Sequence, residues 1–226
     1  AYLRGLQEQK EKVRAVIEEQ GALTEELAAA LEAAATMTEL DDLYRPYRPK
    51  RRTRAMIARE RGLEPLAALI MLQNLNRPAL EEAERYVSEE KGVSSSQEAL
   101  AGAMDILAER ISDNAKYRTY IRRATRDQGT IQSLAKDPKE KSVYEHYYEY
   151  EEPVRKCAGH RVLALNRGEA EKYLTVKILA PEDVILKYLE KQVVTRDNPH
   201  TSPVLRSVIE DSYKRLIAPS IEREIR

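Results

Sequence analysis

The spacing of apolar residues along most of the chain is that of amphipathic α-helices. In Tyr2–Gln20, for example, apolar residues recur every three or four positions, and charged or polar residues fill most of the positions between them. This period gathers the apolar side chains on one face of a helix, where a core can bury them. The same period, with the glycines and prolines that interrupt it, predicts further helices at residues 25–35, 54–61, 65–74, 78–91, 97–111, 141–150, 159–168, 181–194 and 203–217, and one between Ser112 and Gly129.

Only one segment has the clear alternating pattern of a β-strand. Leu174, Val176 and Ile178 alternate with polar residues, so they would lie on one face of a strand. Residues 130–138 are expected to be irregular or to form a short strand. We therefore predict an all-α fold, an irregular multi-helix array with at most one small β element. Two parts are expected: an N-terminal helical region, residues 1–135, and a second helical subdomain, residues 136–226, that leads to a downstream domain.

The helical pattern stops in the stretch Glu39–Leu66, which reads ELDDLYRPYRPKRRTRAMIARERGLEPL. Pro46 and Pro49 fix φ, lack a backbone N–H donor and disfavour the helical conformation in the residue before each of them. We therefore expect an extended segment over Arg45–Arg52, which we call the strap. Thr53 is expected to cap the helix that follows.

The strap is also the most basic part of a chain that carries no net charge. The whole chain has 38 Lys and Arg residues and 38 Asp and Glu residues, so attraction to nucleic acid must come from a local patch. Between Arg45 and Arg61 the only acid is Glu60. Lys and Arg bind phosphates without regard to sequence. The candidate nucleic-acid-binding residues are therefore Arg48, Lys50, Arg51, Arg52 and Arg54.

A structural interpretation of the same residues stays open. In it, the prolines set the path of the chain, Tyr44 and Tyr47 pack against neighbouring helices, and the cations pair with helix carboxylates. A run of charges is commonly a solvated or ion-paired surface, and the sequence alone does not identify the carboxylates that would be its partners.

No constellation of catalytic or metal-binding residues stands out. Cys157 and His160 form a C-x-x-H pair, but a zinc site needs about four ligands and no second pair is present. Neither a phosphate-binding P-loop nor a dinucleotide-binding glycine motif occurs. We therefore expect no catalytic residue, no metal site, no cofactor and no small-molecule substrate.

The cysteine content and the apolar runs of the sequence favour a particular compartment. Cys157 is the only cysteine, which excludes an intrachain disulfide and suits a reducing compartment. The longest apolar run, Leu66–Leu72, is far too short to span a bilayer, and no signal peptide is visible, so we expect a cytoplasmic protein without membrane contact. The chain starts without Met and stops within a helical pattern, as a fragment would.

Two segments carry a resemblance to a known family. ELDDLYRPYRPKRRTRAMIARERGLEPLA resembles the signature of the Tex family of bacterial transcription accessory proteins, LEDLYLPYKPKRRT followed by an alanine and then IARE-GLEPLA, and HRVLALNRGE at residues 160–169 matches as well. The resemblance covers essentially the whole chain. It implies a helical region that precedes an RNase H-like domain, helix-hairpin-helix elements and an OB-fold RNA-binding module in a larger protein that binds nucleic acid.

These observations predict a non-catalytic helical scaffold of a Tex-like transcription accessory protein. Its expected partner is RNA or DNA, bound without sequence preference, and the transcription machinery is a further candidate. The alternative is a protein-interaction module that docks on the transcription machinery or on the protein's own further domains and makes no direct contact with nucleic acid.

Overall fold

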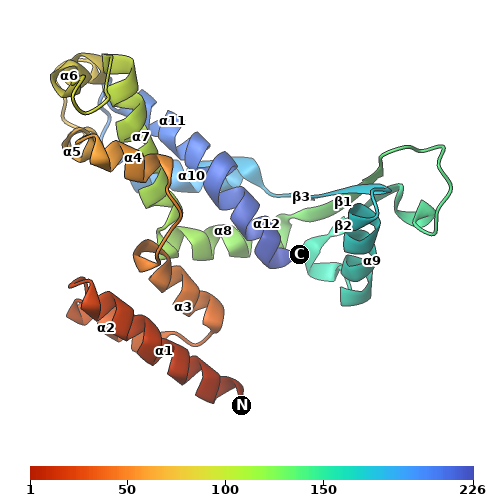
Figure 1. Ribbon diagram of the computed structural model, residues 1–226. Helices are drawn as coiled ribbons and strands as arrows, with labels where there is room; N and C mark the ends of the chain where they lie inside the picture. Colours follow the sequence, from red (N-terminus) through yellow and green to blue (C-terminus); the bar gives the residue numbers. More distant parts are fainter. The chain divides into compact units, whose positions relative to one another are not determined.

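The computed structural model describes all residues from Ala1 to Arg226, most of them in helices, with one small sheet (Figure 1). Two compact units can be distinguished. Unit 1 comprises Ala1–Thr119 and Glu190–Leu216, and unit 2 comprises Tyr120–Leu189 and Ile217–Arg226. The sequence predicted a single domain boundary, after residue 135, and that boundary stays a prediction.

Unit 1 is entirely helical apart from its loops and one isolated β-bridge. Its elements are α1 (Tyr2–Glu19), α2 (Glu25–Ala33), α3 (Met37–Tyr44), α4 (Arg54–Glu60), α5 (Glu64–Met71), α6 (Ala79–Ala83), α7 (Ser96–Ser112) and α11 (Ser202–Asp211), with 3₁₀ turns at Arg45–Tyr47 and Glu84–Tyr86. Three further elements have residues in both units: α8 (Ala115–Gln128), α10 (Glu182–Val193) and a short π-helix (Ser212–Ile217).

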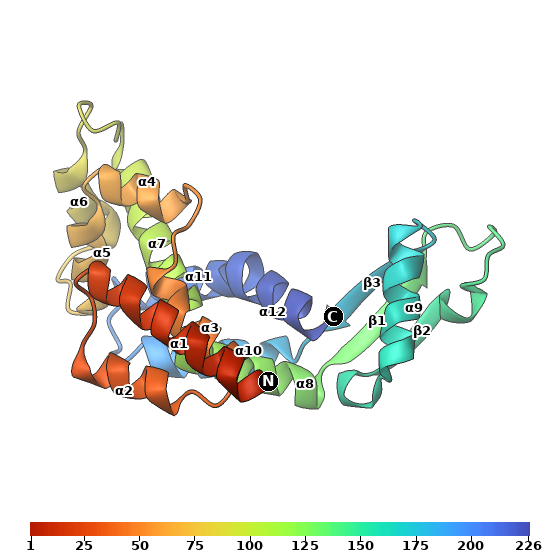
Figure 2. The same ribbon diagram turned by 60° about the horizontal axis from the view of Figure 1, so that its bottom comes forward.

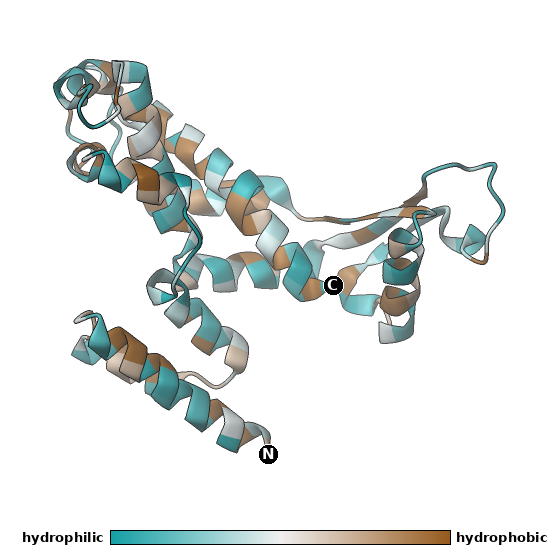
Figure 3. Ribbon diagram, in the orientation of Figure 1, coloured by the Kyte–Doolittle hydropathy of each residue, from teal (hydrophilic) through white to brown (hydrophobic).

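The first three helices form a small core of their own within unit 1. Figure 2 shows α1, α2 and α3 side by side, and buried Leu6, Val13 and Ile17 of α1 meet Leu31 of α2 and Leu40 of α3. In Figure 3 these helices carry both apolar and polar positions, as amphipathic helices do. The helical period read from the sequence is therefore confirmed here.

Helix α7 is the centre of the rest of unit 1, where α4, α5, α6 and α11 all pack against it. Ser95 caps α7 by accepting a hydrogen bond from the Glu98 N–H, and the Glu98 carboxylate accepts one from the Ser94 N–H. Gly102 lets α4 come close, because a Cβ there would lie 3.3 Å from the Cβ of Ala58 and 2.3 Å from a methyl group of Leu63.

Unit 2 contains the only sheet. Its strands are β1 (Thr130–Ala135), β2 (Glu149–Pro153) and β3 (Leu174–Leu179), antiparallel in the order β2-β1-β3, and its other elements are α9 (Gly159–Ala170), α12 (Ala218–Ile225) and 3₁₀ turns at Glu145–Tyr147 and Val154–Lys156. Opposite pairs include Ile131 with Ile178 and Ser133 with Tyr150. Ile131 also shares a buried cluster with Leu165 of α9, so α9 covers one face of the sheet.

The fold is therefore mostly helical, as predicted, but it is not all-α. The strand at residues 174–179 is confirmed, and residues 130–135 form the strand that was one of the two expectations for that segment. None of the helices combines the length and the apolar character that crossing a membrane requires.

Two predicted helices are wrong. In residues 78–91 the helix stops early, since α6 and its 3₁₀ turn end at Tyr86 and Ser88 then pairs with Val93 across a turn that Gly92 closes at φ +80°. In residues 141–150 only one 3₁₀ turn forms before β2 begins. There the Tyr148 hydroxyl donates to the Glu140 carbonyl, Glu149 and Tyr150 pair with β1, and this pairing outweighs the local helical pattern.

Candidate nucleic-acid interface

The strap is only partly extended. Arg45 keeps the helical conformation, with φ −49° and ψ −46°, and Pro46 lies in the 3₁₀ turn Arg45–Tyr47 that continues α3. Proline is tolerated in the first turn of a helix because its missing N–H has no helical partner there. The prediction of an extended Arg45 is therefore wrong. The extended path starts at Arg48, with ψ 135°, and no helix or strand is formed until α4 begins after Thr53.

Lys50 points inward, toward the C-terminal end of α7. Its ammonium pairs with the carboxylate of Asp113 and lies 3.7 Å from a carboxylate oxygen of Glu109. The Lys50 side chain is 20% exposed, and the side chains of both partners are 13% exposed. This candidate residue is therefore a structural ion-pair partner, as the alternative interpretation of the strap proposed.

Glu109 links the start of α4 to α7. Its carboxylate accepts a hydrogen bond of 2.8 Å from the Thr53 hydroxyl and one of 3.2 Å from Arg59. Burial raises the pKa of Glu109, but the Thr53 hydroxyl and the charges of Lys50 and Arg59 outweigh burial and hold the pKa below its ordinary value. Glu109 is therefore ionised at neutral pH, and the group of residues around it is a partly buried anchor for the strap.

Arg48 and Arg52 form ion pairs on the surface. A guanidinium nitrogen of Arg48 lies 3.3 Å from the Asp41 carboxylate, and the Arg48 guanidinium carbon is 5.3 Å from the centre of the Tyr44 ring. Arg52 lies 2.7 Å from the Glu60 carboxylate. Exposed pairs of this kind contribute about 0–1 kcal/mol to stability, so a phosphate can compete for either arginine.

Arg51 and Arg54 are exposed and have no carboxylate within ion-pair distance. Arg54 is close enough to lower the pKa of Asp105 on α7, although burial has the larger effect and the net pKa of Asp105 is raised. The structure thus divides the five candidate residues into one inward lysine, two arginines in exposed pairs and two unpaired arginines. Their binding to nucleic acid stays a prediction.

A groove between α4 and α7 was not predicted. Its volume is ≈ 310 Å³, and it is lined by Arg54, Ile57, Ala58, Arg61, Leu63, Glu98, Ala101, Gly102 and Asp105. The small residues Ala101 and Gly102 are the sequence signal that a helix approaches α7 closely here. The sequence does not say that the approaching helix is α4.

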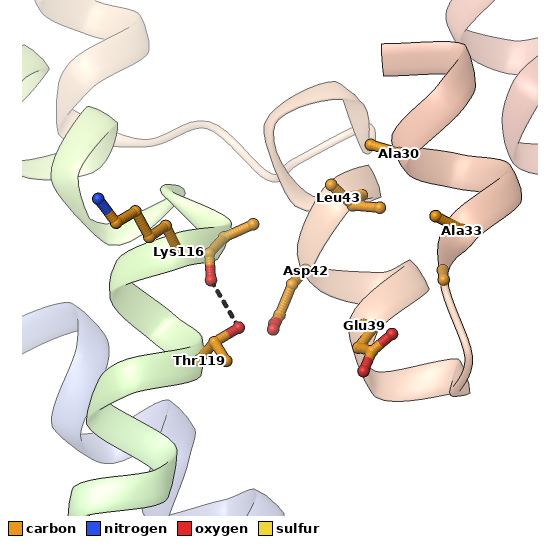
Figure 4. Close-up of a pocket in the computed structure, with 9 residues that line it drawn as sticks. Ala30, Ala33, Glu39, Asp42, Leu43, Lys116 and Thr119 are labelled. Atoms are coloured by element: carbon orange, nitrogen blue, oxygen red, sulfur yellow. Dashed lines mark hydrogen bonds between the residues drawn. The ribbon is translucent and has the colours of Figure 1, made fainter. Parts of the chain in front are cut away.

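A second pocket of ≈ 310 Å³ lies between α2, α3 and the start of α8 (Figure 4). Its polar groups already have partners within the chain. The Thr119 hydroxyl donates to the Ala115 carbonyl at 2.9 Å, the Glu39 carboxylate accepts from the Ala35 N–H at 2.8 Å, and the Lys116 ammonium donates to Gln192. The Asp42 carboxylate lies 3.7 Å from the Arg118 guanidinium. The rest of the lining is alanine and Leu43.

The C-x-x-H pair of unit 2 is not brought together as a metal site. His160 is exposed, whereas burial, with a smaller contribution from Glu152, raises the pKa of the Cys157 thiol to about 11. Arg161 holds the Glu152 carboxylate in place with two hydrogen bonds, of 2.9 and 3.1 Å. No group of three or more His, Cys, Asp or Glu side chains is arranged to hold a metal ion.

The fold and the strap define a mostly helical module with exposed cations beside a partly buried ion-pair anchor. The family model described as Tex central region-like matches residues 74–226, about two-thirds of the chain. The chain belongs to the Tex family, as the resemblance in the sequence predicted.

Three relatives show the range of the similarity. Uncharacterized protein YdcI of Bacillus subtilis is 48% identical over 100% of this chain, which covers 32% of YdcI. Transcriptional accessory protein Tex of Neisseria gonorrhoeae is 37% identical over 80% of this chain and 24% of its own length. S1 RNA-binding domain-containing protein 1 of Pongo abelii is 30% identical over 99% of this chain and 25% of its own length. The chain thus spans a third or less of these relatives.

Proposed function

We propose that this chain is a non-catalytic helical scaffold of a Tex-like transcription accessory protein, and that it contacts the backbone of RNA or DNA through the strap and Arg54 at the start of α4. The exposure of Arg51 and Arg54 without carboxylate partners carries the proposal. Two relatives are named a transcriptional accessory protein and an S1 RNA-binding domain-containing protein, and these names support a role in transcription and RNA binding. The proposal includes no cofactor, no small-molecule substrate and no membrane, and it places the protein in the cytoplasm.

The geometry of the strap suits a phosphate backbone. Residues in an extended chain advance by roughly 3.3 Å each, so neighbouring cations of the strap can reach successive phosphates. Four arginines are available, two unpaired and two in exposed pairs, while Lys50 keeps the strap on α7. Contacts to phosphate carry no base information, so we expect all sequences to bind about equally through these residues.

A second function, a protein-interaction module without nucleic-acid contact, is favoured by the pocket in Figure 4. Because its polar wall groups are already bonded within the chain, it suits an apolar side chain of a partner protein better than a charged or polar ligand. The partner would be a component of the transcription machinery or another domain of the same protein.

Fluorescence anisotropy with a labelled single-stranded oligouridine at low salt separates the two functions. We expect the parent chain to bind and the variant with Arg48, Arg51, Arg52 and Arg54 changed to Gln to lose most of the affinity. A matched control removes four cations from α1 and α8, where Arg4, Lys12, Arg14 and Arg123 are exposed, and is expected to bind nearly as the parent. Equal losses of affinity in both variants, or no binding by the parent chain, would favour the protein-interaction function instead.

A further inference from the structure

The groove between α4 and α7 has one wall from each helix. The α4 wall is formed by residues at positions i, i+3, i+4 and i+7, namely Arg54, Ile57, Ala58 and Arg61, and the α7 wall repeats that spacing with Glu98, Ala101, Gly102 and Asp105. The charge of Arg54 acts on Asp105 and that of Arg61 acts on Glu98, so each end of the groove carries an arginine opposite a carboxylate. The middle of the groove is apolar.

The two carboxylates of the groove differ in their hydrogen bonds. One oxygen of Glu98 accepts the Ser94 N–H at 2.9 Å. The Asp105 carboxylate accepts no hydrogen bond from the chain, and its closest cation, Arg215, is 3.7 Å away. A half-buried carboxylate without a donor is costly, and burial raises the pKa of Asp105 accordingly. Both oxygens of Asp105 are therefore available to donors from a ligand.

We propose that this groove binds an unpaired guanine base of a single-stranded nucleic acid, with Asp105 accepting hydrogen bonds from the N1–H and N2–H groups of the base. Arg54, the first residue of α4, stacks on the base or pairs with its phosphate, and Ile57 and Ala58 contact the ring. The proposal rests on the proposed function of the strap, to which it adds a preference for one base.

Guanine matches the Asp105 carboxylate of the groove better than other ligands do. A carboxylate accepts two parallel N–H donors well, and only guanine among the four common bases presents two adjacent donors on its Watson–Crick edge. Cytosine and adenine place a ring acceptor beside the amino group, which a carboxylate repels. An arginine side chain of a protein also presents two donors, but it would enter beside Arg54, Arg61 and Arg215, whose charges repel it. The volume of ≈ 310 Å³ is at the small end for ligand pockets, which start at about 300 Å³.

The test uses the full chain and single-stranded oligouridines of about twelve nucleotides, a length within the range of single-strand sites. One central uridine is replaced by guanosine, inosine, adenosine or cytidine. Inosine is guanosine without the N2 amino group, so it removes one of the two proposed hydrogen bonds. We expect the guanosine oligonucleotide to bind roughly fivefold or more tightly than the uridine parent, with inosine in between.

The variant Asp105→Asn should lose the guanine preference, because an amide presents a donor to one of the two donors of the base. Asp211→Asn is the matched control. It removes the same charge next to the same Arg215, but the Asp211 carboxylate is already bonded to Arg215 at 2.9 and 3.0 Å and does not line the groove. We expect this control to keep the guanine preference.

The outcomes separate the two proposals. Tight binding of every oligonucleotide without a guanine preference would refute the guanine pocket and leave the strap contact standing. A titration with guanosine monophosphate, followed by amide NMR signals of Ala101 and Gly102, tests the pocket without the strap. Tighter binding of guanosine monophosphate than of inosine monophosphate supports the pocket even if no oligonucleotide binds. If no oligonucleotide binds and guanosine monophosphate shifts neither signal, the pocket is refuted as well.

Discussion

Replacing Lys50 by Met should destabilise unit 1, although Lys50 belongs to a charged surface segment. Met keeps the apolar part of the side chain and removes the ammonium. Glu109 retains Thr53 and Arg59 as partners, but Asp113 loses its only ion pair. Leaving a fully buried polar group unsatisfied costs about 1–3 kcal/mol, and the partial exposure of Asp113 argues for the lower part of that range. We expect a loss of about 1–2 kcal/mol in the free energy of unfolding of unit 1.

The assay must report on unit 1 alone, because two units need not unfold together. Native-state hydrogen exchange of the slowest amides in α7 meets this requirement. A loss of one or two kcal/mol changes the folded-to-unfolded ratio about 5- to 30-fold, and these amides should exchange faster by that factor. Arg51→Met is the control, since Arg51 is exposed and unpaired, and surface changes of this kind stay within about 0.5 kcal/mol. Equal exchange in the two variants would refute the structural role of Lys50.

The remaining predictions concern one glycine in each unit and the Cys157 thiol of unit 2. A Cβ at Gly168 would lie 2.5 Å from a methyl carbon of Leu174, so Gly168→Ala should destabilise unit 2 by about 1–3 kcal/mol. A Cβ at Gly5 in α1 would meet no atom within 4 Å, so Gly5→Ala should raise stability by up to about 1 kcal/mol. Urea unfolding of each variant checks the sign of its effect. The pKa of Cys157 is raised from 9.0 to about 11, so alkylation by iodoacetamide near pH 8 should be about a hundredfold slower than for an ordinary thiol and should keep accelerating up to pH 11. The Glu152 carboxylate adds to the effect of burial on the Cys157 pKa, so Glu152→Gln should speed alkylation of Cys157. An unchanged rate would show that Glu152 does not raise this pKa.

The parts of the fold that depend on local physics could be predicted. Thr24, Thr53 and Ser95 each accept the capping hydrogen bond expected at a helix start, and α1, α2, α4, α7, α9 and α10 begin and end within two residues of their predicted bounds. Caps and apolar periods act within a few residues, so a single sequence contains them.

The parts that depend on long-range contacts could not be predicted. The segment 141–150 has a helical apolar period, but Tyr144 is buried in the core of the sheet and Glu149–Pro153 pairs with β1. These contacts exist only once the sheet has formed, and they outweigh local propensity. The helix predicted at 78–91 fails for a different, local reason, because Ser88 and Val93 pair with each other across a turn that Gly92 closes.

The sequence identified the cations of the candidate site. It did not show which of them are paired with carboxylates and which are free to bind a ligand. Lys50 is 63 residues away from Asp113 along the chain, so no local pattern shows that it is paired while its neighbour Arg51 is not. The groove also needs two distant segments, since Arg54 and Asp105 come from different helices. Charge runs therefore locate a candidate surface, and only the packing of α7 against the strap shows which of its cations are available.

The salt dependence of binding tests most directly whether the exposed arginines bind phosphate while Lys50 serves the fold. Each phosphate contact to a single strand contributes a slope of about −0.7 in log K against log salt, so four arginines give roughly −2 to −3. Changing Arg51 and Arg54 to Gln should reduce the magnitude of that slope by about 1.4, whereas Lys50→Met should leave the slope unchanged while unit 1 remains folded. A slope that falls for Lys50→Met, or one that is unchanged without Arg51 and Arg54, would contradict the assignment of the exposed arginines to phosphate and of Lys50 to the fold.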